Sequence, residues 1–165
     1  MPRITPFLWF DDEAEQAAEF YVRTFNARPS GEGQGSRIAH VARYNDAGPG
    51  TPGSAMTVQF ELDGQEVVAL NGGPGHPFTD AFSFVVHCLD QDEVDHFWKT
   101  LADGGEEGPC GWLKDRWGLS WQVVPDRLTE LLNDPDPGRA ERAMRAMLQM
   151  GKIEIAELEA AAEGV

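Results

Sequence analysis

The stretch ITPFLWFDDEAEQAAEFYVRTFNA, residues 4–27, contains in order an apolar run, an acidic turn and an amphipathic helical pattern. The same order returns in AFSFVVHCLDQDEVDHFWKTLADGG, residues 81–105. A shift of 77 positions superposes the two copies and places Pro6 on Ser83. Strand-rich sequence follows each copy. The repeat therefore predicts a domain built from two paired modules around a shared cleft.

The first copy predicts a strand and a helix. The nearly continuous apolar run at residues 3–10 favours a buried strand. Asp11 or Asp12 is positioned to cap the helix that follows, because a short acidic side chain accepts hydrogen bonds from the first free amides of a helix. The apolar residues of that helix share one face, which predicts packing against a sheet; they are Ala14, Ala17, Ala18, Tyr21 and Phe25.

Three further strands are predicted in the first module. Residues 37–44 alternate in the manner of a strand, with a period of two. Residues 55–62 and 65–71 flank Asp63-Gly64, a dipeptide typical of a tight hairpin turn. The glycine-rich segment NGGPGHP, residues 71–77, then leads to the second module.

The second module follows the same plan. Asp90 and Glu93 have the spacing of a capping box, and Gly104-Gly105 ends the helix. Strands are expected at 110–114 and 119–124. Three helices complete the chain, and they are expected at 126–133, 139–150 and 152–162.

These elements predict an α+β fold in a single domain, with two βαβββ modules that form a curved mixed sheet around a cleft. The expected boundaries are residues 1–75 for module one, 76–125 for module two and 126–165 for a helical C-terminal extension. A chain of 165 residues is long enough for one substantial core.

Composition and charge exclude several classes of function. The net charge of −15 opposes binding to nucleic acid and to anionic membranes, because both surfaces are negative. No apolar run approaches the ~18 residues of a membrane span, and the first residues do not resemble a signal peptide. We therefore expect a cytoplasmic protein in which Cys88 and Cys110 are free thiols.

Three segments resemble one known family. They are NGGPG at residues 71–75, GPCGWLKDRWGLSWQVVP at 108–125 and RAMRAMLQMGKIEIAELE at 142–159. Together with the repeated module they resemble the PhnB-like proteins of the vicinal oxygen chelate superfamily, which includes glyoxalase I and extradiol dioxygenases. Members of this branch often carry the label 3-demethylubiquinone-9 3-methyltransferase. The resemblance implies a homodimer.

The resemblance also implies where metal ligands would lie. Metal-using members take ligands from the first and last strands of each module, which correspond here to Pro6, Ser83, Gln122 and Val68, the last with an uncertainty of one residue. None of these is a histidine, a carboxylate or a cysteine, the donors that a divalent metal prefers. We therefore expect no metal and no other cofactor. Ser83 and Gln122 would instead be polar groups on an apolar wall, as in a small-molecule pocket.

Few other residues suggest chemistry. Of the four histidines only His87 has the strand spacing to share a face with Ser83, so the predicted ligand-binding cleft comprises Pro6, Ser83, His87 and Gln122. Cys110 has no neighbouring base in the sequence that would activate it. The catalytic residues, if the chain has any, stay unassigned.

Three functions remain open. The favoured interpretation is a metal-free protein that binds a small molecule. The alternatives are a metal-dependent lyase or dioxygenase with ligands that the sequence does not reveal, and a methyltransferase as in the family label. The third is disfavoured because no glycine-rich turn joins a strand to a helix. A neutral ligand is expected, and an anionic one is disfavoured unless Arg43, Lys114 or Arg116 reaches the cleft.

Overall fold

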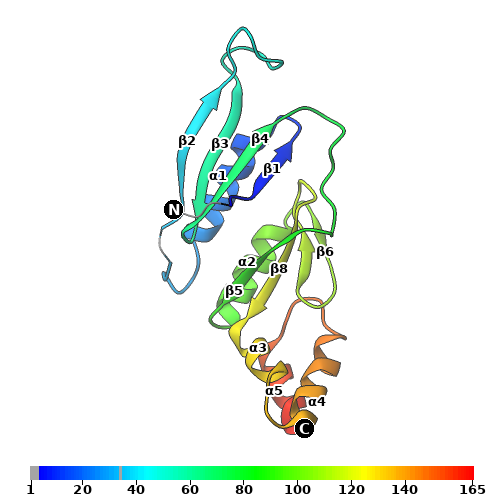
Figure 1. The fold of residues 1–165 in the computed structure, drawn as a ribbon. Helices are drawn as coiled ribbons and strands as arrows, with labels where there is room; N and C mark the ends of the chain where they lie inside the picture. The colour runs from blue at the N-terminus through cyan, green and yellow to red at the C-terminus, as the bar shows by residue number, and fades with distance from the viewer. Residues whose placement is uncertain (1–3, 34) are drawn as a thin grey trace. The chain divides into compact units, whose positions relative to one another are not determined.

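The computed structural model describes residues 4–33 and 35–165, and the chain divides into two compact units after Pro77. The first unit contains β1 (Phe7–Phe10), α1 (Ala14–Asn26), β2 (Arg37–Arg43), β3 (Ala55–Leu62) and β4 (Gln65–Asn71). Its four strands form one sheet in the order β1-β4-β3-β2, with β1 parallel to β4 and the other pairs antiparallel. Helix α1 packs on one face of this sheet (Figure 1).

Strand β1 differs from its prediction in length and burial. It is shorter than the expected run at 3–10, of which Arg3 lies outside the described residues. Leu8 and Phe10 are buried, whereas Phe7 and Trp9 are exposed, Phe7 to 59%. The prediction of a fully buried strand was wrong, because a sheet with a helix on one face buries only every second side chain.

The cap of α1 also differs from its prediction. Neither Asp11 nor Asp12 is the capping residue, since the helix begins after Glu13, which makes no side-chain capping bond. The backbone N–H of Ala14 instead donates to Oδ1 of Asn71, at 2.7 Å. The cap therefore comes from the end of β4, and it ties the helix to the sheet.

The predicted hairpin is confirmed. Strands β3 and β4 pair in antiparallel register up to Leu62 and Gln65. Asp63 and Gly64 lie between them with φ angles of 48° and 82°. Both values are in the left-handed region, which a two-residue turn of this kind requires and which aspartate and glycine tolerate.

The second unit repeats the plan. It contains β5 (Ser83–Cys88), α2 (Gln91–Ala102), β6 (Glu106–Glu107), β7 (Trp112–Lys114), β8 (Ser120–Pro125), α3 (Asp126–Leu132), α4 (Pro137–Met147) and α5 (Ile155–Glu163). Its sheet has the order β5-β8-β7-β6, with β5 parallel to β8, and α2 packs on one face. The predicted capping box is confirmed, since Glu93 N–H donates to Asp90 and the Glu93 carboxylate accepts from Leu89 N–H.

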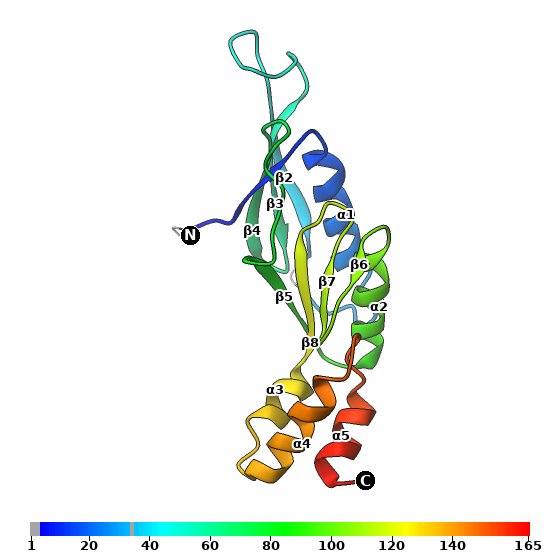
Figure 2. The same ribbon diagram turned by 90° about the vertical axis from the view of Figure 1, so that its right-hand side faces the viewer.

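The C-terminal helices form a layer of their own at the end of β8 (Figure 2). Six buried side chains make their core, and they are Leu128, Leu131, Ala143, Ile153, Leu158 and Ala162. The predicted α+β class with paired modules and C-terminal helices is thus confirmed. No helix in the described part of the chain is long and apolar enough to cross a bilayer.

Candidate functional site

The candidate site lies on the face of the second sheet that points away from α2. Side chains alternate across this sheet, so that Leu113, Trp121 and Val123 are buried beneath the helix. Trp112 and Gln122 are direct neighbours across β7 and β8 on the opposite face. Strand alternation thus places Trp121 under the helix and Gln122 on the other face of the sheet.

Two of the predicted site residues meet on this face. The Gln122 Nε2 atom donates a hydrogen bond to Ser83 Oγ at 3.0 Å. Ser83 belongs to β5 and Gln122 to β8, and the parallel pairing of these strands brings the side chains together. Next to them Val85, the direct partner of Gln122 in the register, has a 43% exposed side chain. The pair therefore has apolar surface beside it, from Val85 and Trp112.

A cavity of about 220 Å³ adjoins this pair. Its wall is formed by Asp80, Glu106, Glu107, Gly108, Pro109, Trp112, Leu113, Lys114 and Ser120. Ser83 and Gln122 do not line it, but each is the register neighbour of a residue that does, Ser120 and Trp112 respectively. The polar pair thus lies on strands next to the cavity wall without being part of it.

The charged groups of the cavity are partly paired. Lys114 Nζ lies 3.2 Å from a carboxylate oxygen of Asp80. Glu107 accepts a hydrogen bond from the indole N–H of Trp98, at 3.0 Å. With Glu106 included, three carboxylates and one ammonium line the cavity, so its local charge is negative.

His87 belongs to the same unit as the polar pair, and Pro6 belongs to the other unit. His87 is on the same strand as Ser83, with a 69% exposed side chain whose Nδ1 atom is 4.0 Å from Asp126. At that exposure and distance the pair is a weak surface interaction. Pro6 belongs to the first unit, just before β1. The placing of these two residues in a cleft stays a prediction.

The repeat is offset differently in its strands and in its helices. Helices α1 and α2 begin at residues 14 and 91, which is the expected shift of 77. The buried strand ends Phe10 and Cys88 are 78 positions apart. Within the strands, Pro6 therefore corresponds to Phe84, on the helix side of its sheet, and not to Ser83. The turn before α1 is one residue longer, which the pattern of apolar residues did not reveal.

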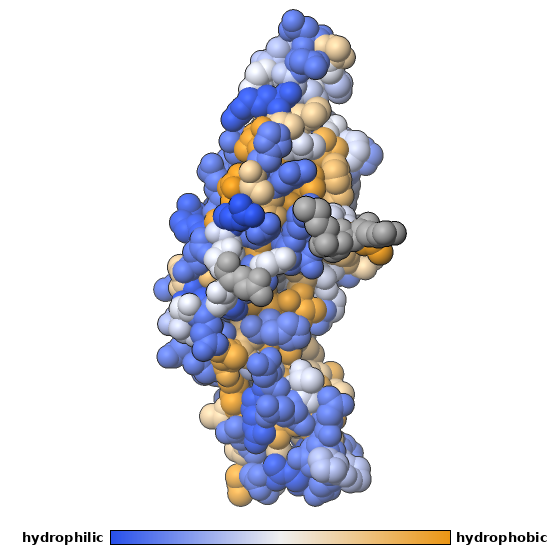
Figure 3. Space-filling model, turned by 60° about the vertical axis from the view of Figure 1, so that its left-hand side comes forward, coloured by the Kyte–Doolittle hydropathy of each residue, from blue (hydrophilic) through white to orange (hydrophobic). Residues whose placement is uncertain are grey.

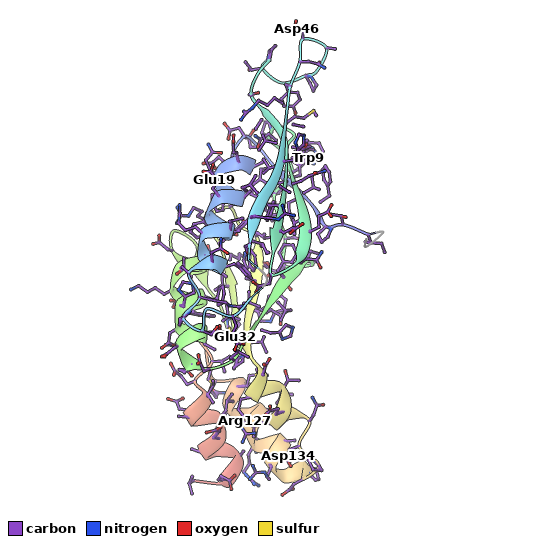
Figure 4. All side chains as sticks on the ribbon, turned by 90° about the vertical axis from the view of Figure 1, so that its left-hand side faces the viewer. Trp9, Glu19, Glu32, Asp46, Arg127 and Asp134 are labelled. Atoms are coloured by element: carbon purple, nitrogen blue, oxygen red, sulfur yellow. The ribbon has the colours of Figure 1, made fainter. Side chains whose placement is uncertain are left out.

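The equivalent face of the first unit is aromatic. Figure 4 shows Trp9 on the side of the sheet opposite to α1, from which Glu19 projects. The Trp9 indole donates to the carbonyl of Gly73 at 2.9 Å, and its ring lies 4.2 Å from that of His76. A Cβ on Gly72 would come within 2.3 Å of this ring, so the NGGPG segment needs glycine there. Apolar patches stand among hydrophilic ones on the surface of this unit (Figure 3).

The residues present do not fit the metal that the superfamily implies. Ser83 and Gln122 offer a hydroxyl and an amide that bond to each other, and Val68 offers no donor. Among residues 4–33 and 35–165, no group of three or more histidine, cysteine or acidic side chains is placed to hold a metal ion. Cys88 and Cys110 are free thiols, as predicted, and Cys88 is buried.

Sequence reasoning missed most of the cavity wall. Asp80 stands in the linker before β5, and Glu106 and Glu107 form the short edge strand β6, which had not been predicted. Lys114 was named only as a residue that could reach the cleft. Its alternation with Leu113 is the one signal that could have placed it beside Trp112, on the face of Gln122.

Comparisons with known proteins show the family and the fold. The family model described as 3-demethylubiquinone-9 3-methyltransferase matches residues 2–124. The solved structure of a PhnB protein from Bacillus cereus is 32% identical, covers 75% of this chain and 99% of its own, and has a TM-score of 0.63. Protein PA1353 from Pseudomonas aeruginosa is 17% identical, covers 76% and 98%, and has a TM-score of 0.59. No curated protein matches the chain.

Proposed function

Because the chain belongs to the PhnB-like 3-demethylubiquinone-9 3-methyltransferase family of the vicinal oxygen chelate superfamily, we propose that it binds a small organic molecule on the open face of its second sheet. The observation that carries the proposal is the Ser83–Gln122 hydrogen bond beside the cavity of about 220 Å³. The family resemblance implies that these positions hold ligands in metal-using relatives, and here their side chains offer hydrogen bonds in place of coordination.

The arrangement suits a ligand with a flat apolar part and one polar group. Trp112 supplies an aromatic wall of the cavity, and an aromatic face packs well against a planar ligand. The Ser83 hydroxyl retains its own proton to donate, and the Gln122 amide retains an acceptor oxygen. A carboxamide or alcohol on the ligand can exchange hydrogen bonds with both.

The charge of the cavity disfavours anions. Lys114 lines the cavity and could attract an anionic ligand. Its ammonium, however, already lies 3.2 Å from the carboxylate of Asp80. Arg43 pairs with Glu15 and Arg116 with Asp103, and neither lines the cavity. The carboxylates of Glu106 and Glu107 repel a negatively charged ligand, so we expect an uncharged ligand.

We expect Gln122→Ala to weaken binding of an uncharged probe about 2- to 10-fold while leaving the fold intact, since one net hydrogen bond contributes ~0.5–1.5 kcal/mol. Benzamide is a suitable probe, titrated by tryptophan fluorescence, with benzoate as the anionic counterpart of the same shape. Gln16→Ala, an exposed change on α1, is the matched control and should alter nothing. Benzoate binding more tightly than benzamide, or equal affinity in Gln122→Ala, would remove the proposal.

The methyltransferase function of the family label finds little support in the fold. The turns between β1 and α1 and between β5 and α2 contain no glycine, whereas nucleotide-type cofactors bind at glycine-rich turns of this kind. Titration with S-adenosylmethionine tests the label directly.

Elemental analysis of protein purified without chelator tests the metal-dependent alternative, and stoichiometric zinc, nickel or iron would overturn our first choice.

We also propose that the protein is a homodimer, as the family resemblance implies. Apolar side chains on the open faces of both sheets support this, because Phe7 and Val85 are 59% and 43% exposed and such surface is costly in water. Light scattering at micromolar concentration should give about twice the mass of 18.2 kDa. A strict monomer would contradict the proposal.

A further inference from the structure

The C-terminal helices lie beyond the part of the chain that the family model matches, although the segment at residues 142–159 resembles the family in sequence. The family model ends at residue 124, and the Bacillus cereus structure is covered to 99% by three quarters of this chain. Helices α3 to α5 occupy residues 126–163. The effect of these helices on the site therefore cannot be inferred from the family model.

One short segment connects these helices to the cavity. We call residues 150–155, which lead from α4 into the first residue of α5, the anchor segment. The carbonyl of Met150 accepts from Cys110 N–H and that of Gly151 from Gly111 N–H, both at 2.8 Å. Cys110 and Gly111 lie between Pro109 and Trp112, two residues of the cavity wall.

The other end of the anchor segment is held by α2. The side-chain amide of Gln91 donates to the carbonyl of Ile153 at 3.0 Å and accepts from the N–H of Ile155 at 2.9 Å. Lys152 lies 2.7 Å from Asp95 on the same helix. This contact lowers the pKa of the Asp95 carboxyl and raises that of Lys152, because each charge stabilises the other.

The loop that the anchor segment contacts has an uncommon backbone. Cys110 has a φ angle of 57°, in a region that residues other than glycine rarely occupy. Such a conformation costs on the order of 1 kcal/mol or more and persists only where the surroundings impose it. Gly111 has a φ angle of 83°, and a Cβ there would lie 2.9 Å from the carbonyl oxygen of Val123 and 3.3 Å from Ile153. The two bonds from the anchor segment are contacts that impose this geometry.

We infer that the C-terminal extension positions the ligand-binding wall, with the anchor segment holding the Cys110–Gly111 backbone so that Trp112 faces the cavity. Gln91 is the positioning residue, since it fixes the anchor segment on α2 and lines no part of the cavity. The expected effect of the anchor segment on ligand affinity rests on the proposed function. Its structural part, the control of the loop by the extension, can be measured without any ligand.

The two cysteines allow a direct test on the full chain. Gln91→Leu removes both hydrogen bonds to the anchor segment with little change in volume. We expect amide exchange at Cys110 and Gly111, and the reaction of the Cys110 thiol with a disulfide reagent, to become about tenfold faster. The buried Cys88 thiol should keep its rate, and benzamide affinity should fall at least threefold. Gln91→Glu keeps the acceptor for Ile155 N–H but sets a carboxylate oxygen against the carbonyl of Ile153 and the carboxylate of Asp95, so it should also speed exchange at Cys110 and Gly111.

Arg142→Met is the matched control, because Arg142 binds the carbonyls of Ala161 and Ala162 in the same helical layer, away from the loop. It should leave exchange at Cys110 unchanged. Equal exchange in Gln91→Leu and the native chain would overturn the inference, as would equal acceleration in both variants. If the Cys88 thiol also reacts faster in Gln91→Leu than in the native chain, the second unit has unfolded in that variant. The exchange rates of Gln91→Glu then test the inference by the same criteria. If benzamide does not bind the native chain, the proposed function fails while the exchange rates still decide the role of the anchor segment.

Discussion

An Asp115→Ala chain is expected to lose about 3 kcal/mol of unfolding free energy, because three donors, two of them buried, lose their acceptor at once. Asp115 is 2% exposed and lies in the turn between β7 and β8. One carboxylate oxygen accepts from the backbone N–H groups of Trp117 and Leu119, at 2.9 and 3.1 Å. The other accepts from the indole N–H of Trp121, at 2.9 Å.

Urea denaturation followed by circular dichroism measures this loss. Asp103→Ala is the control, since Asp103 is exposed and makes a surface pair with Arg116 that contributes ~0–1 kcal/mol. Asp115→Asn should fall between the two variants, because the amide can accept from one partner but presents a donor to another. A loss below about 1 kcal/mol for Asp115→Ala would show that water or a rearranged turn replaces the carboxylate.

Gly105→Ala is expected to have an effect of similar size. An ideal Cβ at this position would stand 2.0 Å from the carbonyl oxygen of Lys114 and 2.7 Å from the carbonyl carbon of Asp115. Both are backbone atoms, so no side-chain rotation relieves the collision. Strand β6 must separate from β7, which removes Glu106 and Glu107 from the cavity wall. We expect a cost of about 3 kcal/mol and a melting temperature lower by roughly 10 °C.

Calorimetry of the variant checks this expectation, and Gly118→Ala provides the comparison. Gly118 has a φ angle of 86° with no atom within 4 Å of an added Cβ. Its substitution tests backbone strain alone, at ~1 kcal/mol. Equal melting temperatures for the two variants would mean that the strand adjusts to the added methyl group.

The face of each sheet that stays open could be predicted only in part. In β8 the alternation of Trp121 and Gln122 was sufficient, because a strand with one apolar and one polar face has a single favourable orientation. In β1 the run of apolar residues carries no such alternation, so it predicts burial for Phe7 and Trp9 as well as for Leu8 and Phe10. Because this run has no alternation, the sequence does not show that the strands are offset by 78 residues while the helices are offset by 77. The sequence therefore pairs Pro6 with Ser83, whereas the structure pairs Pro6 with Phe84.

The sequence by itself determined the elements whose signals are local. Helices α1 and α2, the capping box of Asp90 and Glu93, the Asp63-Gly64 turn and the α+β class all depend on residues within a few positions of one another. Only the tertiary structure decided which distant groups meet. The cap of α1 comes from Asn71, 57 positions away, and Gln91 binds Ile153 across 62. Such contacts depend on strand register and helix packing, which are properties of the whole core and leave no periodic trace in the chain.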